Sequence, residues 1–154
     1  MTRDVTIVGI GSTLMGDDGI GVRAAERLRE AELPDGIRVV ASGLIGVDLV
    51  YELEELEAAV IIDAADFRGE PGEIKVASPD QIEDLGIERL GAAHSIGLAE
   101  ALTMLKLTGA DPVIRLVCVQ PKDVSPREAL SPELEARLAA VCDAALEAAR
   151  GLRE

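Results

Sequence analysis

The residues best suited to chemistry are two adjacent acids, Asp17 and Asp18, in the glycine-rich segment "GIGSTLMGDDGIG" at residues 9–21. Glycine-rich turns that follow a strand often bind nucleotide phosphates. Here Leu14 replaces the third glycine of the dinucleotide pattern, no Gly-Lys-Ser/Thr follows, and two carboxylates would repel a pyrophosphate. The segment argues against nucleotide binding. It leaves two interpretations, a helix cap or a set of oxygen ligands for a cation.

Asp63 and His94 are two further polar residues at the ends of expected elements. Asp63 closes the apolar run "AAVIID" at residues 58–63, so its carboxylate must be paired, hydrogen-bonded, metal-bound or neutralised, unless it only caps a turn. His94 is the single histidine and begins an expected helix, where a neutral imidazole is favoured. The ordinary alternative for it is an interior or capping histidine. If the three loops meet, two carboxylates and one imidazole suit a divalent ion such as Ni²⁺, Zn²⁺ or Mn²⁺.

Alternating strands and amphipathic helices must position these groups. They predict an α/β fold, a three-layer α/β/α domain with a mostly parallel, about five-stranded sheet and helices on both faces. No repeat, linker or low-complexity segment divides the chain, so we expect a single domain over residues 1–154. The expected strands are 5–10, 37–42, 58–63, 73–77 and 113–121. A first expected helix has Ile20, Ala24, Leu28 and Ala31 on its inward side, and a second spans 46–57. A third begins with the capping box at 78–81, and a fourth spans 94–107 with Leu98, Leu102 and Leu105 on the same side as His94. The last begins at Ser131 and Pro132 and has Leu134, Leu138, Val141 and Ala145 on its inward side.

Composition narrows the range of partners. The 154 residues are 48% hydrophobic but only 1% aromatic, which predicts an aliphatic core, and the net charge is −14. Such an acidic surface repels phosphate backbones and anionic lipids, so nucleic acid and membranes are poor partners, whereas a metal ion or a cationic partner is suitable. The sequence contains no apolar stretch of signal-peptide or membrane-span length. We therefore expect a cytoplasmic protein, with a monomer as the default state.

Two cysteines, Cys118 and Cys142, lie in apolar runs typical of a strand and a helix. They are too few for a disulfide scaffold and too far apart for a metal knuckle, so we expect two buried thiols. The sequence also contains no convincing serine–histidine–acid arrangement, and covalent catalysis is not expected.

Three motifs in order, "GIGSTLMGDDGIGVR", "VIIDAADFRGEPGEI" and "HSIGLAEAL", resemble the hydrogenase maturation endopeptidases. Those enzymes remove the C-terminal extension from the large subunit of nickel–iron hydrogenases. The resemblance spans nearly the whole chain, including "SGLIGVDLV" and the segments "VCVQPKDVSP" and "LSPELEARL". One departure is Ser12, where the family commonly has Asn. A serine can still hydrogen-bond the turn.

The resemblance implies that Asp18, Asp63 and His94 bind nickel and that Asp18 and Asp63 take part in catalysis, with Asp17 the less favoured of the adjacent acids. It implies a nickel-dependent, aspartic-type hydrolase that activates a hydrogenase by processing its large-subunit precursor. The nickel would arrive already installed in that precursor, and zinc or cadmium would be surrogates in the isolated protein. Either the ion polarises the scissile carbonyl or activates a water, or an aspartate acts as general base.

Two other interpretations of the same residues stay open. A phospho-receiver module would use Asp17 and Asp18 for Mg²⁺, Asp63 as phospho-acceptor and Lys122 as its cation, but the segment "GIGSTLMG" separates the first strand from the acids and His94 would have no role. A nickel-checking chaperone would bind the precursor without cutting it and would use the same three residues. In either maturation role, residues 42–46 and the loop after Asp63 are candidate contacts for the precursor.

Overall fold

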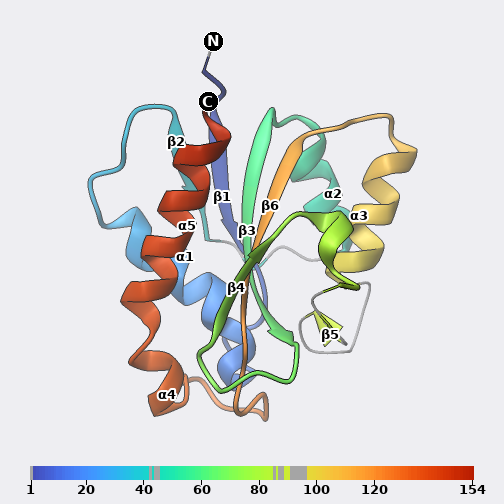
Figure 1. The fold of residues 1–154 in the computed structure, drawn as a ribbon. Coiled ribbons are helices and arrows are strands. Elements are labelled where there is room, and N and C mark those ends of the chain that lie inside the picture. The colour runs from blue at the N-terminus through green and yellow to red at the C-terminus, as the bar shows by residue number, and fades with distance from the viewer. Residues whose placement is uncertain (1, 42, 44–45, 85, 87–88, 91–96) are drawn as a thin grey trace.

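The computed structural model describes residues 2–41, 43, 46–84, 86, 89–90 and 97–154. Its centre is a sheet in the order β2-β1-β3-β6-β4 (Figure 1). The first four strands in this order are parallel, and β4 is antiparallel to β6. A short β5 pairs with the end of β3 in antiparallel fashion. The strands are β1 Val5–Gly9, β2 Ile37–Val40, β3 Ala58–Asp66, β4 Ile74–Ala77, β5 Arg89–Leu90 and β6 Val113–Val119.

Helices cover both faces of the sheet. Helices α1 (Ile20–Arg29) and α5 (Leu138–Leu152) lie on one face, and α2 (Gly46–Glu54) and α3 (Leu98–Leu107) lie on the other (Figure 1). A short α4 (Pro132–Glu135) precedes α5, and two 3₁₀ turns complete the elements, η1 (Gly16–Gly19) and η2 (Pro79–Gln81). The predicted three-layer, mostly parallel α/β fold is therefore confirmed.

Strand β3 is the central element and separates two aliphatic cores. Eight of its nine residues are buried, as its uninterrupted apolar run predicts. Val60 and Ile62 belong to the core under α1 and α5, whereas Ala59 and Ile61 belong to the core under α2 and α3. Because side chains alternate along a strand, Asp63 falls on the α2/α3 side.

The order of the strands reverses between β1 and β3, which makes a topological switch point at the carboxyl ends of these two strands. The chain passes from β1 to β2 on one side of β1, and β3 then follows on its other side. Helix α1, in the connection that leaves β1, covers one face, whereas α3, in the connection from β3 to β6, covers the other, so the segments that leave the carboxyl ends of β1 and β3 diverge. In open α/β sheets ligands bind at this switch point. The turn η1 follows β1 there, and Asp63 lies toward the carboxyl end of β3.

Several predicted bounds shift for local reasons. Strand β3 continues to Asp66, beyond the predicted end at 63, because β5 supplies a partner for its last residues. The predicted inward position of Ala31 is wrong, because α1 ends at Arg29, before Pro34, and Ala31 is exposed. The helix predicted from Ser131 is divided into α4 and α5. At the break, Arg137 turns its Nε toward the carbonyl oxygen of Gly72, 3.1 Å away.

Other expectations about the helices are confirmed. The inward faces predicted for α3 and for the C-terminal helices are buried, and Ser78 and Gln81 form the predicted capping box around a single 3₁₀ turn. The predicted start of the α3 helix at residue 94 lies outside the described residues. None of the helices in the described ranges has the length and apolar character needed to span a bilayer.

Candidate functional site

Asp18 is positioned by the glycine-rich turn after β1. The chain reverses at Gly11, whose φ of 115° is accessible to glycine, and a Cβ there would lie 2.1 Å from the backbone oxygen of Asp18. This close approach lets the backbone N–H of Ser12 donate to Oδ2 of Asp18 at 2.8 Å. The side chain of Asp18 is almost completely buried. The glycine therefore brings two backbone segments together around one carboxylate.

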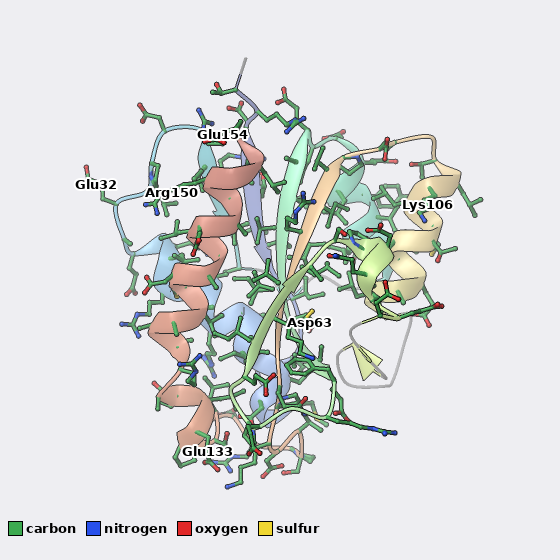
Figure 2. All side chains as sticks on the ribbon, in the orientation of Figure 1. Glu32, Asp63, Lys106, Glu133, Arg150 and Glu154 are labelled. Carbon is green, nitrogen blue, oxygen red and sulfur yellow. The ribbon has the colours of Figure 1, made fainter. Side chains whose placement is uncertain are left out.

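Asp63 lies inside the molecule on β3, paired in register with Cys118 of β6 (Figure 2). It is 3% exposed, and its Oδ1 has no hydrogen-bond partner among the residues that the structure describes. Burial raises the pKa of Asp63 well above its usual value, and the negative charge of Asp18 raises it further. A hydrogen bond with the backbone of Ala64 opposes both effects only in part. Asp63 therefore keeps its proton to a higher pH than an ordinary aspartate does.

Asp18 and Asp63 thus share one buried site at the switch point of the sheet, close enough for the charge of one to shift the pKa of the other. Two carboxylates in such a place need a proton or a cation between them. Within the described ranges no three His, Cys, Asp or Glu residues form a group that would hold a metal by themselves. The third predicted donor, His94, lies outside those ranges, and the assignment of ligand roles stays a prediction.

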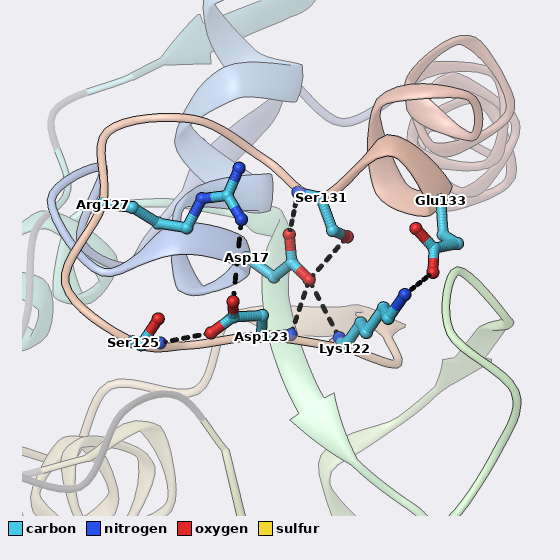
Figure 3. Close-up of polar contacts among 7 residues, drawn as sticks. All are labelled: Asp17, Lys122, Asp123, Ser125, Arg127, Ser131 and Glu133. Atoms are coloured by element: carbon cyan, nitrogen blue, oxygen red, sulfur yellow. Dashed lines mark hydrogen bonds and ion pairs between the residues drawn. The ribbon is translucent and has the colours of Figure 1, made fainter.

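Asp17 has a different environment from its neighbour. Its carboxylate is fully buried and accepts four hydrogen bonds from the far end of the chain (Figure 3). Oδ1 accepts the backbone N–H of Ser131 at 2.7 Å, and Oδ2 accepts the Ser131 hydroxyl at 2.8 Å and the N–H groups of Lys122 and Asp123 at 2.9 Å each. Asp17 is not a hydrogen-bonding helix cap, because neither η1 nor α1 has a side-chain cap hydrogen bond and the Asp17 carboxylate is bonded to residues 122, 123 and 131 instead.

Gln120, directly after β6, is a polar residue that the sequence analysis did not identify. Its Oε1 accepts the backbone N–H groups of Phe67 at 2.9 Å and Gly69 at 3.0 Å, and its Nε2 donates to Asp66 at 3.2 Å. The side chain is buried and fixes the loop that leaves β3 beside the site. Arg68 in this loop has a φ of 60°, a conformation uncommon outside glycine. The only signal in the sequence was a polar residue at the end of an apolar strand.

Cys118 faces the site but is unsuited to nucleophilic attack. Burial, reinforced by the charge of Asp63, raises the pKa of its thiol to about 12. The thiol therefore stays protonated at neutral pH. Cys118 and Cys142 are both free and buried, as predicted.

Lys122 is not placed as the receiver interpretation requires. A phospho-receiver needs this ammonium group beside the acceptor carboxylate of Asp63. Instead, the Nζ of Lys122 forms an ion pair with Glu133 at the surface, with about half of the lysine side chain exposed (Figure 3).

Fold and site together define a class: a doubly wound α/β domain with a buried pair of carboxylates at its switch point. Comparison with known proteins identifies the family within that class. The chain belongs to the hydrogenase maturation protease family, a family of hydrolases, because the family model matches residues 22–148. This membership confirms the resemblance seen in the motifs, and it leaves the receiver interpretation without support.

Individual relatives agree with this assignment. The chain is 35% identical over 144 residues to the hydrogenase expression/formation protein HupM of Azotobacter chroococcum, covering 88% of this chain and 68% of the relative. Its fold is similar to that of the hydrogenase maturating endopeptidase HybD from E. coli, with a TM-score of 0.82, 29% identity and coverage of 96% and 92% of the two chains. The hydrogenase maturation protease HycI of Thermococcus kodakarensis has a TM-score of 0.74 at 26% identity, with coverage of 97% and 94%.

Proposed function

We propose that this chain is an endopeptidase that removes the C-terminal extension of a nickel–iron hydrogenase large-subunit precursor after nickel has been inserted. Membership of the hydrogenase maturation protease family supports proteolysis in hydrogenase assembly. The observation that carries the proposal to particular residues is the buried pair Asp18 and Asp63 at the switch point.

In this proposal the nickel ion is part of the substrate, and the carboxylates of Asp18 and Asp63 recognise it. The Oδ1 of Asp63, which has no hydrogen-bond partner among the described residues, and the raised pKa of that carboxyl favour a proton when no cation is present. An incoming divalent ion favours the ionised form and displaces the proton. Oxygen donors from Asp18 and Asp63, with an imidazole nitrogen from His94, suit a borderline ion such as nickel. A precursor without its ion offers no charge to offset the burial of two carboxylates, so it is not selected.

The same pair supports peptide hydrolysis in two ways. A bound ion polarises the scissile carbonyl or lowers the pKa of an attacking water. Alternatively Asp63 acts as general base, and its raised pKa brings it closer to the pH at which proton transfer is efficient. Both routes use the aspartates and neither needs a nucleophilic side chain, which agrees with the protonated state of Cys118.

The test is processing of a purified precursor in two forms, nickel-loaded and nickel-free. We expect the wild-type chain to shorten only the loaded form, as seen by the intact mass of the large subunit. Asp18→Asn, Asp63→Asn and His94→Ala should each abolish the shortened product while the variants remain folded. Asp143→Asn makes the same chemical change at an exposed position on α5 and should keep wild-type activity.

Three outcomes would count against the proposal. Full activity in any of the three site variants would remove the acid pair or the histidine from the mechanism. Equal cleavage of the loaded and nickel-free precursors would show that the protein does not recognise the nickel ion. Stable binding of the loaded precursor without any shortened product would favour a non-cleaving chaperone.

A further inference from the structure

We propose that Asp17 is a positioning residue that fixes the direction of the Asp18 carboxylate by locking η1 onto the segment 121–131, here called the 121–131 loop. The proposal rests on the proposed function, because the site it serves is the Asp18–Asp63 pair. It gives the two adjacent acids separate roles: one contacts the substrate and the other holds the first in place.

The bonding around Asp17 supports this division. Its carboxylate accepts hydrogen bonds from four donors of the 121–131 loop, namely the N–H groups of Lys122, Asp123 and Ser131 and the hydroxyl of Ser131 (Figure 3). The backbone N–H of Asp17 in turn donates to the carbonyl oxygen of Asp123 at 2.8 Å. One residue of η1 is therefore held from both its backbone and its side chain.

Neighbouring backbone contacts continue this attachment. The N–H of Gly16 donates to the carbonyl oxygen of Arg127 at 2.9 Å, and the N–H of Arg127 donates to the carbonyl oxygen of Leu14 at 3.0 Å. Met15 and Arg127 form an isolated parallel bridge. The 121–131 loop therefore contacts the chain from Leu14 to the first residue of η1.

The geometry of a 3₁₀ turn explains how fixing Asp17 also fixes Asp18. Such a turn has about three residues per turn, so consecutive side chains point about 120° apart around its axis. Once the Asp17 side chain is held toward the 121–131 loop, the Asp18 side chain must point to another side, where Ser12 and Asp63 lie. A 3₁₀ turn of four residues has little stability of its own, so contacts outside it set its rotation.

A lock of this kind is useful because the two site carboxylates repel each other when both are ionised. Asp18 carries the charge that raises the pKa of Asp63, and repulsion favours turning Asp18 away from the site. The four hydrogen bonds that the Asp17 carboxylate accepts from the 121–131 loop resist that rotation, and they place no further charge in the site. The backbone N–H of Ser12, 2.8 Å from Asp18, then completes the fixed geometry.

The first measurement is steady-state processing by Asp17→Asn. The asparagine keeps the shape of the side chain, but its amide nitrogen must face at least one donor of the 121–131 loop, which breaks the lock. We expect kcat to fall at least about tenfold with KM changed less than about twofold, because the precursor still binds. Ser131→Ala removes one of the four hydrogen bonds and should give a smaller loss in the same direction.

A matched control is Asp123→Asn. The carboxylate of Asp123 accepts the N–H of Ser125 at 2.8 Å and pairs with Arg127 at 3.6 Å, so its contacts stay inside the 121–131 loop. Asp123 bonds to Asp17 through its backbone N–H and carbonyl oxygen, so this side-chain change removes none of the hydrogen bonds that hold Asp17. We expect kcat and KM close to those of the wild type.

The second measurement does not depend on activity. The amide proton of Ser12 reports the position of the Asp18 carboxylate, because it donates to that group. In amide-exchange and NMR experiments we expect Asp17→Asn to speed exchange and shift the resonance of the Ser12 amide, with a smaller effect in Ser131→Ala and none in Asp123→Asn.

The outcomes separate this proposal from the proposed function. If the wild-type chain cuts no precursor, the proposed function fails, and the Ser12 amide alone still tests the coupling. An unchanged Ser12 amide in folded Asp17→Asn overturns the positioning role, as does wild-type kcat in that variant or a loss confined to KM. Should Asp17→Asn not fold, Ser131→Ala decides the matter by the same amide and by kcat.

Discussion

Replacing Asp63 by Asn should stabilise the protein, and the gain should grow with pH. The folded-state pKa of Asp63 is raised by burial and by the charge of Asp18, whereas in the unfolded chain it takes the ordinary value of about 3.9. Between these two pKa values the folded protein keeps a proton that the unfolded chain has lost. The stability of the wild type therefore falls as pH rises through this window, and it is flat below the unfolded pKa and above the folded pKa. The side-chain amide in Asp63→Asn does not titrate, so the variant escapes this loss.

The size of the effect follows from one proton. In the window, the unfolding free energy of Asp63→Asn relative to wild type should increase by about 1.4 kcal/mol per pH unit. For a chain of this size that corresponds to a difference in Tm that widens by about 3–6 °C per pH unit. The slope should end at the folded-state pKa of Asp63, so the break in the curve measures that pKa directly.

The assay is urea and thermal unfolding of both proteins between about pH 5 and pH 8, above the sequence pI of about 4.4, where solubility is lowest. Comparing the variant with wild type at each pH cancels the other titrating groups, which both share. Asp143→Asn, an exposed change on α5, is the control and should give a difference that stays within about 0.5 kcal/mol and does not vary with pH.

Two results would refute the reasoning. The first is an Asp63→Asn variant that is less stable than wild type at pH 8, which would mean that the ionised carboxylate is compensated in the fold. The second is a stability difference that does not change with pH, which would place the folded-state pKa at its ordinary value. Adding Ni²⁺ gives a further check, since a cation bound to the pair favours the ionised form and should raise the Tm of wild type but not of the variant.

Three further outcomes are expected. Gly11→Ala should destabilise the fold by about 2 kcal/mol or more and reduce processing, because a Cβ there would lie 2.1 Å from the backbone oxygen of Asp18; chemical denaturation measures the first effect. Gln120→Ala should lower stability by about 2–3 kcal/mol and speed amide exchange in the loop after β3, whose N–H groups lose their acceptor. Cys118 and Cys142 should resist a thiol-alkylating reagent at pH 8 until denaturant is added, since both are buried and burial raises the pKa of both thiols; rapid labelling of the native protein would contradict this.

The sequence predicted the layers and the place of the site because both depend on local patterns. The apolar run of β3 is continuous because both faces of that strand are covered, and Asp63 is conspicuous as the charge that interrupts it. Alternation of strands with amphipathic helices then places the carboxyl ends of parallel strands at one edge. From these patterns alone, the turn with Asp17 and Asp18 was expected at the same edge as Asp63, and the preference for Asp18 came from the family resemblance. The structure places Asp18 close enough to Asp63 to raise its pKa.

The role of Asp17 was not predictable in this way. Its four hydrogen-bond donors lie 105–114 residues away along the chain, and three of them are backbone N–H groups that carry no side-chain signature. Two adjacent aspartates look equivalent in sequence, yet the 3₁₀ turn points them in different directions. Gln120 escaped notice for a related reason, because its partners are also backbone N–H groups of a distant loop.

The location of Asp63 explains how the fold tolerates an unfavourable group. A buried carboxyl lowers stability when, as for Asp63 within the described part of the chain, one of its oxygens has no hydrogen-bond partner. Asp63 lies on the strand that packs into the cores on both faces of the sheet. At the edge strand β2, where burial is incomplete, the same group would be solvated and its pKa would stay ordinary. At the centre of the sheet, burial raises the pKa of the carboxyl and favours its neutral form. The packing of β3 therefore offsets the instability of Asp63 and also produces the raised pKa that the proposed recognition of nickel requires.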